Sequence, residues 1–366
     1  HNNGVVWLSG SGETVAIMDG GYNFGFSSSF THEAFDYKKS NGNISKYGTL
    51  TAAATNSAGT HGAIVSAIAA AEFIVSTDDD DFIGVAWAAN IHATQKGAHA
   101  SDDGLTHTTN GTIDADNNHA AIVQNNSWGI LNDRYCEANV AQFNRCVSNG
   151  WNDSQVLTYS DLKGIKDYHS LSWDQAYSFF LASDYSSSTS ITKMQNYITA
   201  LNNFQDTGVI VFALSNTYTE NDGSAMSGLP LAYTQLAEAW LSVGWIEIQG
   251  STISASSVKR GSGTGGGKCG LQAAFCVVAP GGNYNGPGWQ SADHYVTNLN
   301  GSSFAAPAVS GSIALLAQAF PNHTPAQLVD RLLASANNSF FTISAFTEFT
   351  NGVKHGYNTE FGHGIP

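Results

Sequence analysis

Positively charged residues are scarce in this chain of 366 residues. Lysine and arginine together number 14, against 29 aspartates and glutamates, and the formal net charge at pH 7 is -15. A surface of this sign repels phosphate backbones and anionic headgroups, which argues against nucleic acid and anionic membranes as partners. Charged residues make up only 12% of the chain, so serine, threonine, asparagine and glycine must build most of the surface.

Long hydrophobic runs are also missing. No stretch approaches the roughly 18 apolar residues that a membrane-spanning helix needs. The hydrophobic share of 42% is nevertheless enough for a sizeable core. The sequence shows no signal peptide, so we expect a processed or trimmed form if the protein is exported.

Cysteine is rare, and the four cysteines form two local pairs, Cys136 with Cys146 and Cys269 with Cys276. Four cysteines allow three pairings, of which the local one is the simplest. No Cys-x-x-Cys spacing occurs, which argues against a cysteine metal site. The even number, the scarce lysine and the polar loops indicate an extracellular or cell-surface location; four buried free thiols would indicate a cytosolic enzyme instead.

Short apolar runs that end in polar residues or turns recur along the chain. They are typical of buried parallel strands, and helical patterns alternate with them. The sequence therefore predicts an α/β fold with a mainly parallel sheet. Because no repeat or clear linker is visible, we expect a single domain over 1–366 with a long insertion at about 130–207. The runs lie at 14–18, 121–129, 208–216 and 275–281.

Two predicted helix starts carry candidate reactive side chains. Apolar residues recur at helical spacing after His61, which would lie in the first turn of a buried helix. Another buried helix follows Gly301, which places the Ser303 hydroxyl at a helix N-terminus, where an oxyanion is favoured. Pro307 would fit the first turn of that helix, where a missing N–H group costs little. A further helix begins at the capping box Thr324-Pro325-Ala326-Gln327.

Each candidate also has a purely structural interpretation. Asp19, at the end of the first run, would open a turn; His61 would be a core histidine; Ser303 would cap a core helix. As a set they favour catalysis, because reactive groups collect at the carboxyl ends of parallel strands. A serine nucleophile needs a base to take its proton, and a buried aspartate holds that base in the right tautomer.

These segments resemble the signatures of the subtilisin-like serine proteases, the subtilases. The resemblance rests on Ala-Ile-Met-Asp19, on Gly59-Thr60-His61, and on Gly301-Ser302-Ser303-Phe304-Ala305-Ala306-Pro307, in the chain order that subtilisin has. It implies a three-layer fold with helices on both faces of the sheet. It also implies a secreted serine endopeptidase that uses no cofactor. Asp19 would orient His61, His61 would take the Ser303 proton, and an acyl-enzyme would form.

The same resemblance assigns the surroundings of the nucleophile. Asn216 corresponds to the oxyanion asparagine, with the Ser303 N–H group as the second donor. A protein or peptide substrate would bind as an added strand, and Trp128 would favour its apolar or aromatic side chains unless the indole fills the core. The residues expected to contact substrate are Ser127, Trp128, Gly129, Ala213 and Leu214.

Some features point to a subgroup or depart from the family pattern. Cys269-Gly270 and the segment 275–281 resemble the protease passengers of Gram-negative autotransporters. Gly62 stands where valine is usual, Phe304 stands where methionine is usual, and the insertion has no counterpart in small secreted members. These departures concern specificity pockets rather than catalytic groups.

Two alternatives remain open from the sequence. The run Asp78 to Asp81 is either a solvated loop or part of a structural Ca²⁺ site, since hard cations take several oxygen ligands from one loop. The whole chain is either a protease or a catalytically silent subtilase fold that binds peptides or adhesion partners. An esterase of the Gly-x-Ser-x-Gly type is disfavoured because Ala305 occupies the second glycine position. We expect a monomer.

Overall fold

A central sheet organises the structure, a computed structural model that describes residues 7–22, 24–25, 31–50, 60–72, 83–96, 104–130, 156–181, 187–260, 266–288, 290–350 and 352–366. The sheet has eight strands in the order β2-β3-β1-β4-β5-β6-β7, and β8 also pairs with β6. Every pair is parallel except β6 with β7, which confirms the predicted mainly parallel sheet. The strands are β1 (Thr14–Asp19), β2 (Ile44–Tyr47), β3 (Asn90–Gln95), β4 (Val123–Asn126), β5 (Val209–Ala213), β6 (Trp240–Ile248), β7 (Val258–Lys259) and β8 (Cys276–Pro280).

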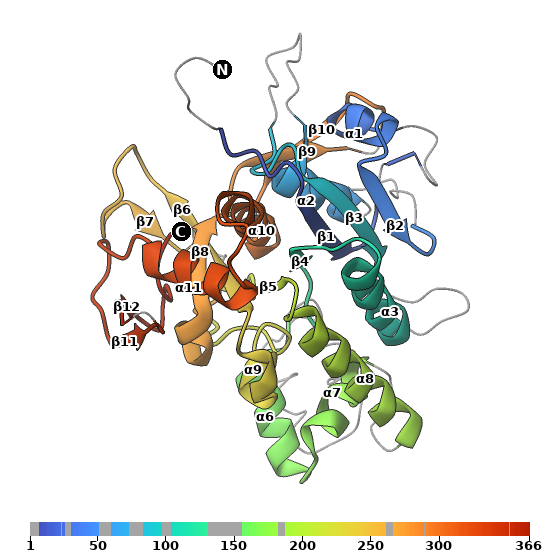
Figure 1. The fold of residues 1–366 in the computed structure, drawn as a ribbon. Helices are drawn as coiled ribbons and strands as arrows, with labels where there is room; N and C mark the ends of the chain where they lie inside the picture. Colours follow the sequence, from blue (N-terminus) through green and yellow to red (C-terminus); the bar gives the residue numbers. More distant parts are fainter. Residues whose placement is uncertain are drawn as a thin grey trace.

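Helices pack on both faces of this sheet (Figure 1), which confirms the three-layer architecture. Helices α2, α10 and α11 cover one face, while α3 and α8, with α6 and α7 beside them, cover the other. The helices are α1 (Asp36–Ser40), α2 (His61–Ala70), α3 (Gly104–Asn117), α6 (Tyr159–Tyr168), α7 (Trp173–Leu181), α8 (Ser188–Phe204), α9 (Leu229–Ala232), α10 (Ser302–Ala319) and α11 (Pro325–Ser335). Two antiparallel pairs, β9 (Tyr284–Pro287) with β10 (Tyr295–Leu299) and β11 (Ala345–Glu348) with β12 (Lys354–Tyr357), lie outside the sheet. Short 3₁₀ helices span Glu33–Phe35, Thr234–Leu236 and Gly270–Phe275.

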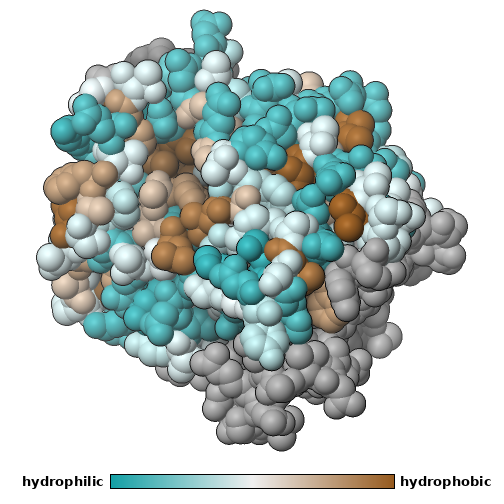
Figure 2. Space-filling view, turned by 90° about the horizontal axis from the view of Figure 1, so that it is seen from below, coloured by the Kyte–Doolittle hydropathy of each residue, from teal (hydrophilic) through white to brown (hydrophobic). Residues whose placement is uncertain are grey.

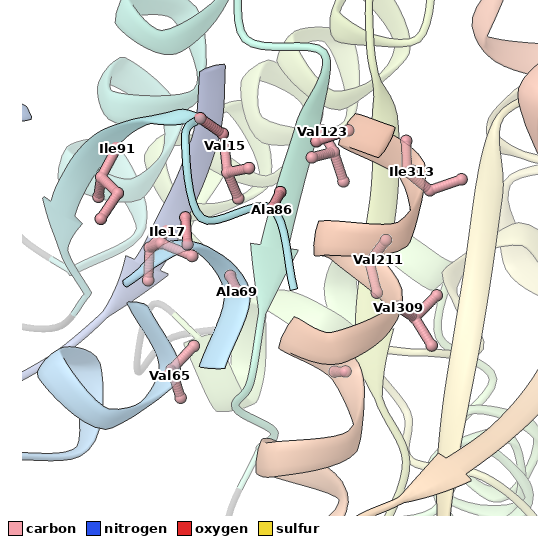
Figure 3. Packing of buried hydrophobic residues seen from close by; sticks show 14 of the residues in the cluster. Val15, Ile17, Val65, Ala69, Ala86, Ile91, Val123, Val211, Val309 and Ile313 are labelled. Carbon is pink, nitrogen blue, oxygen red and sulfur yellow. The ribbon is translucent and has the colours of Figure 1, made fainter. Parts of the chain in front are cut away.

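The alternation of side chains along β1 explains why both faces are covered. Val15 and Ile17 point to one face and pack with Val65 of α2 and Val309 of α10 (Figure 3). Ala16 points the other way and joins a second core that includes residues of α3 and α8. Successive residues of a strand face opposite sides, so a run that is apolar at every position must be buried on both.

The described part of the predicted insertion at 130–207 contributes α6, α7 and α8. Tyr177 of α7 is fully buried and donates a hydrogen bond from its hydroxyl to the carbonyl of Ala225 at 2.8 Å. Phe204 of α8 lies in the same core as Phe212 of β5. These helices therefore share a hydrophobic core with the sheet.

The chain end and the cysteines follow the predicted pattern where the structure describes them. Helix α11 begins with the predicted capping box at Thr324 and Gln327. Cys269 and Cys276 form a disulfide, which is the local pairing. Cys136, Cys146 and the run Asp78 to Asp81 lie outside the described residues.

The surface is mainly hydrophilic on the face shown in Figure 2. Figure 2 shows a face on which hydrophilic and intermediate residues predominate and hydrophobic ones lie in separate patches. This agrees with the low proportion of charged residues in the sequence. None of the described helices combines the length and the apolar character that crossing a bilayer requires.

Candidate active site

Asp19 lies at the carboxyl end of β1 and is 5% exposed. Its Oδ1 atom accepts hydrogen bonds from the Gly20 N–H at 2.7 Å and from the Nδ1 atom of His61 at 2.8 Å. An ionised carboxylate only accepts, so the Nδ1 atom of His61 must carry the proton. The lone pair of a neutral imidazole is then on Nε2, which is the arrangement that a general base needs.

The first turn of α2 holds His61 in this position. The N–H group of Gly62 donates to the carbonyl of Gly20 at 2.7 Å, which fixes the helix start to the turn after β1. A Cβ atom on Gly62 would lie 2.8 Å from the ring of Tyr22 and 3.0 Å from the Gly20 carbonyl. There is no room for a side chain, which explains why glycine stands where the family usually has valine.

Two opposing effects act on the imidazole of His61. Burial lowers the pKa of His61, whereas the negative charge of Asp19 and the hydrogen bond between them raise it. The net result is a pKa above the ordinary histidine value. The side chain is 27% exposed, so the ring remains accessible from outside.

Ser303 is the second residue of α10, where a backbone N–H group has no partner within the helix. Its hydroxyl donates to the carbonyl of Ser127 at 3.2 Å, and the Ser127 hydroxyl donates to the carbonyl of Ser303 at 2.9 Å. No hydrogen bond joins Ser303 to His61 within the described part of the chain. The two helix starts do meet, because the imidazole lies beside the ring of Phe304 with 5.7 Å between their centres. Catalytic hydrogen bonds are often long or misaligned until substrate binds.

The prediction that Pro307 lies in the first turn of its helix is wrong. Helix α10 begins at Ser302, so Pro307 is its sixth residue and sits inside the helix. The N–H group that proline lacks would have bonded the carbonyl of Ser303. That carbonyl instead accepts the hydroxyl of Ser127, which offsets the lost helical bond. The proline thus leaves the carbonyl of Ser303 free to bind Ser127, which directly follows β4.

Asn216 follows β5 and is exposed. Its Oδ1 atom accepts two hydrogen bonds from Ser302, one from the N–H group at 2.7 Å and one from the hydroxyl at 2.8 Å. With Oδ1 engaged by Ser302, the Nδ2 donors of Asn216 are the ones left to bind an oxyanion. Gly301 has a φ of 152°, and a Cβ atom there would lie 3.2 Å from that Nδ2 atom, so the approach requires glycine.

The side chain of Trp128 is partly buried against the core, so it is not a fully exposed surface for binding substrate. Its indole packs against Phe212 with 5.4 Å between ring centres, and the Lys96 ammonium lies 4.8 Å from the ring centre. The Nε1 atom is buried and has no hydrogen-bond partner among the described residues. Trp128 therefore contributes to the core with at least part of its ring.

The other residues predicted to bind substrate offer mainly backbone groups. The side chains of Ser127, Ala213 and Leu214 are buried. The carbonyl of Leu214 lies 2.6 Å from the Ser302 hydroxyl, whose single proton it shares with Asn216 Oδ1. Gly129 lies so close to Val156 that a Cβ atom would be 2.6 Å from its side chain.

Lys96 and Ser302 were not identified from the sequence. The backbone N–H group of Lys96 donates to the carbonyl of Asp19 at 2.5 Å. Burial lowers the pKa of the Lys96 side chain, and the charge of Asp19 offsets this only in part. Lys96 directly follows β3, so the rule that pointed to Asp19 also applies to it. Ser302 lies beside a candidate nucleophile, and its role becomes visible only in its bonds to Asn216.

The chain resembles known proteins in sequence and in fold. Residues 10–364 match the subtilase family. A search of curated proteins found no match. The solved prenylagaramide maturation protease PagA is 18% identical with a TM-score of 0.52, over 89% of this chain and 84% of that one. MycP1 from the ESX-1 type VII secretion system is 20% identical with a TM-score of 0.53, over 98% and 79%. A cold adapted subtilisin-like serine proteinase is 18% identical with a TM-score of 0.51, over 97% and 91%.

The family match spans almost the whole chain, from before β1 to the last turn. The solved structures, at these low identities, show that the fold is shared. The chain therefore belongs to the subtilase family of serine endopeptidases.

Proposed function

We propose that this chain is a secreted serine endopeptidase that acts through Asp19, His61 and Ser303. The observation that carries the proposal is the 2.8 Å hydrogen bond from His61 Nδ1 to the buried carboxylate of Asp19. It supplies an oriented imidazole with a raised pKa at the helix start that adjoins α10, where Ser303 lies.

The first step is binding of the substrate as a strand beside Ser127. A substrate N–H group that bonds the Ser127 carbonyl would displace the Ser303 hydroxyl, which is its donor without substrate. The released hydroxyl can then turn to the Nε2 atom of His61. Binding and activation of the nucleophile are coupled in this way.

In the chemical step His61 takes the proton from Ser303 Oγ, and the oxygen attacks the scissile carbonyl carbon. The negative charge moves to the carbonyl oxygen, where Asn216 Nδ2 and the Ser303 N–H group donate to it. The C–N bond breaks when His61 returns the proton to the leaving amine, and an acyl-enzyme remains. Water, deprotonated by His61, then releases the second product and restores Ser303.

The setting of the enzyme is part of the proposal. The disulfide between Cys269 and Cys276 supports an oxidising, extracellular location, because such bonds persist there. We also propose a monomer with a single catalytic domain, and a structural Ca²⁺ at Asp78 to Asp81 remains a prediction. An origin as an autotransporter passenger rests only on the resemblance of Cys269-Gly270 and segment 275–281.

A catalytically silent fold that binds peptides is the second candidate. One observation favours it, since the Ser303 hydroxyl donates to Ser127 and not to His61. Hydrolysis of a casein-type substrate separates the two. We expect activity in the parent chain and its loss in Ser303→Ala down to the residual level of triad knockouts. Equal hydrolysis by both proteins would contradict the assignment of Ser303.

A further inference from the structure

Two histidines and an aspartate meet at the sheet face opposite α2. His92 lies on β3, Asp114 on the last turn of α3, and His119 just beyond that helix. The Nε2 atom of His92 is 3.4 Å from the Oδ2 atom of Asp114, and the Nε2 atom of His119 is 3.5 Å from that same oxygen. One ligand atom from each residue lies within 4.8 Å of the others.

Hydrogen bonding does not explain this cluster. His92 is fully buried, and its Nε2 atom has no hydrogen-bond partner among the residues that the structure describes. A buried polar atom left unpaired destabilises the folded state. The separations of 3.4 and 3.5 Å are also longer than the usual 2.7–3.2 Å of an N–H···O bond.

The two separations from Asp114 do match the edge length of a metal coordination tetrahedron. Bond lengths of about 2.0–2.2 Å from Zn²⁺ to imidazole nitrogen or carboxylate oxygen give ligand–ligand edges of roughly 3.4 Å. The rings of His92 and His119 are stacked, with centres 4.1 Å apart and planes at 25°. His119 must therefore rotate to aim its lone pair at a shared ion. Its side chain has room to do so, because it is 29% exposed and lies beyond the end of α3.

Nδ1 of His92 and Oδ1 of Asp114, the ring nitrogen and carboxylate oxygen that would not bind the ion, already have hydrogen-bond partners. Ser45 Oγ lies 2.9 Å from the Nδ1 atom of His92, so a proton on Nδ1 can be donated to the serine, which leaves the lone pair on Nε2. Asn118 Nδ2 donates to the Oδ1 atom of Asp114 at 2.6 Å and leaves Oδ2 facing the two imidazoles. Outer contacts of this kind fix the tautomer and the orientation of metal ligands.

We infer that His92, Asp114 and His119 form a binding site for one divalent transition-metal ion, with Zn²⁺ as the ion that fits best. Two imidazoles and one carboxylate suit zinc, whereas calcium takes oxygen ligands. The ion joins the end of α3 to β3. Ile91 and Ala93 belong to the core on the α2 side, so His92 between them faces away from His61. The site is structural and separate from the proposed catalytic one.

The test uses the full chain with Ser303→Ala, which prevents self-cleavage in every sample. Protein freed of metal with a chelator is titrated with Zn²⁺, and bound metal per chain and the unfolding temperature are measured. We expect one tightly bound ion per chain and a rise in the unfolding temperature, because a ligand that binds only the folded state stabilises it. Co²⁺ in place of Zn²⁺ should give the intense visible absorption of a tetrahedral site.

Single substitutions test whether the ion binds at this cluster. His119→Ala and Asp114→Asn, both at the surface end of the cluster, should lose the tight ion and the temperature shift. Ser45→Ala should bind about 10–100-fold more weakly, as expected for an outer contact. His169→Ala, which removes an exposed histidine after α6, is the control and should bind as the parent does. Absence of a stoichiometric ion in the parent, or unchanged binding by His119→Ala, would overturn the inference.

Discussion

The contact between Asp19 and His61 determines how the proposed enzyme responds to pH. Burial alone would lower the pKa of the imidazole, but the adjacent carboxylate raises it by a larger amount. A charge at 2.8 Å stabilises the protonated ring, which forms when His61 takes the serine proton. The same contact that holds the tautomer therefore also stabilises the charged intermediate.

The pH profile of kcat/KM should reflect this. His61 acts as a base only when it is neutral, so activity should rise with pH through the pKa of His61. Because that pKa is raised, we expect the midpoint of the rising limb to lie above the ordinary histidine value of about 6.5. In Asp19→Asn the rate should fall by about 10⁴ and the midpoint should move to lower pH. A midpoint that is the same in both proteins would show that Asp19 does not act on His61.

The contribution of the proposed oxyanion donor, Asn216, can be measured separately from that of Ser302, which positions it. Asn216→Ala removes the proposed donor and should lower kcat by about 10²–10³. Ser302→Ala removes the hydroxyl, whose one proton is shared between Oδ1 and the Leu214 carbonyl, and keeps the N–H bond to Oδ1. We therefore expect a loss of about tenfold, which corresponds to one ordinary hydrogen bond. KM should change little in either variant. Equal rates for Asn216→Ala and the parent would remove Asn216 from this role.

At the scale of the element, helix α10 brings the nucleophile to the sheet. It consists largely of small residues and lies against α2 and several strands. Its composition follows from this close packing: at Gly311 a Cβ atom would lie 2.7 Å from the Cβ atom of Val85 and 2.8 Å from the carbonyl of Ala69. A shift of α10 would displace Ser303 as well.

Two glycine substitutions in helices should therefore act in opposite directions. Gly311→Ala forces the new methyl group against backbone atoms, so the free energy of unfolding should fall by about 1–3 kcal/mol. Gly164→Ala in α6 meets nothing within 4 Å and should raise it by about 0.4–1 kcal/mol, because alanine restricts the unfolded chain. Denaturant unfolding of both variants measures the difference. A neutral or stabilising Gly311→Ala would contradict the close packing of α10 on α2.

The elements that local pattern specifies were predictable from the sequence. The run before Asp19, the helix after His61 and the capping box at Thr324 all appear as expected. The position of Pro307 was not, because the helix start depends on the contacts of Ser302 with Asn216 and on the hydroxyl of Ser127. Those partners lie far away in the sequence, and no local rule identifies them.

At the scale of the whole molecule, the α/β class followed from alternating patterns, whereas the surroundings of single side chains did not. The sheet order and the covering of one face by α6, α7 and α8 depend on which apolar surfaces meet. Trp128 illustrates the limit, since an indole suits both a core and a binding surface. Only the contacts with Phe212 and Lys96 show how much of it is enclosed.

The most direct measurement is covalent labelling of the folded chain by a serine-directed phosphonate, with the modified residue located by mass spectrometry. The three groups must converge for one serine to react, so we predict a single label on Ser303. The label should be lost in Ser303→Ala and strongly slowed in His61→Ala. A chain that stays folded and unlabelled, or one that is labelled at the same rate without His61, would show that Asp19, His61 and Ser303 do not form a catalytic unit.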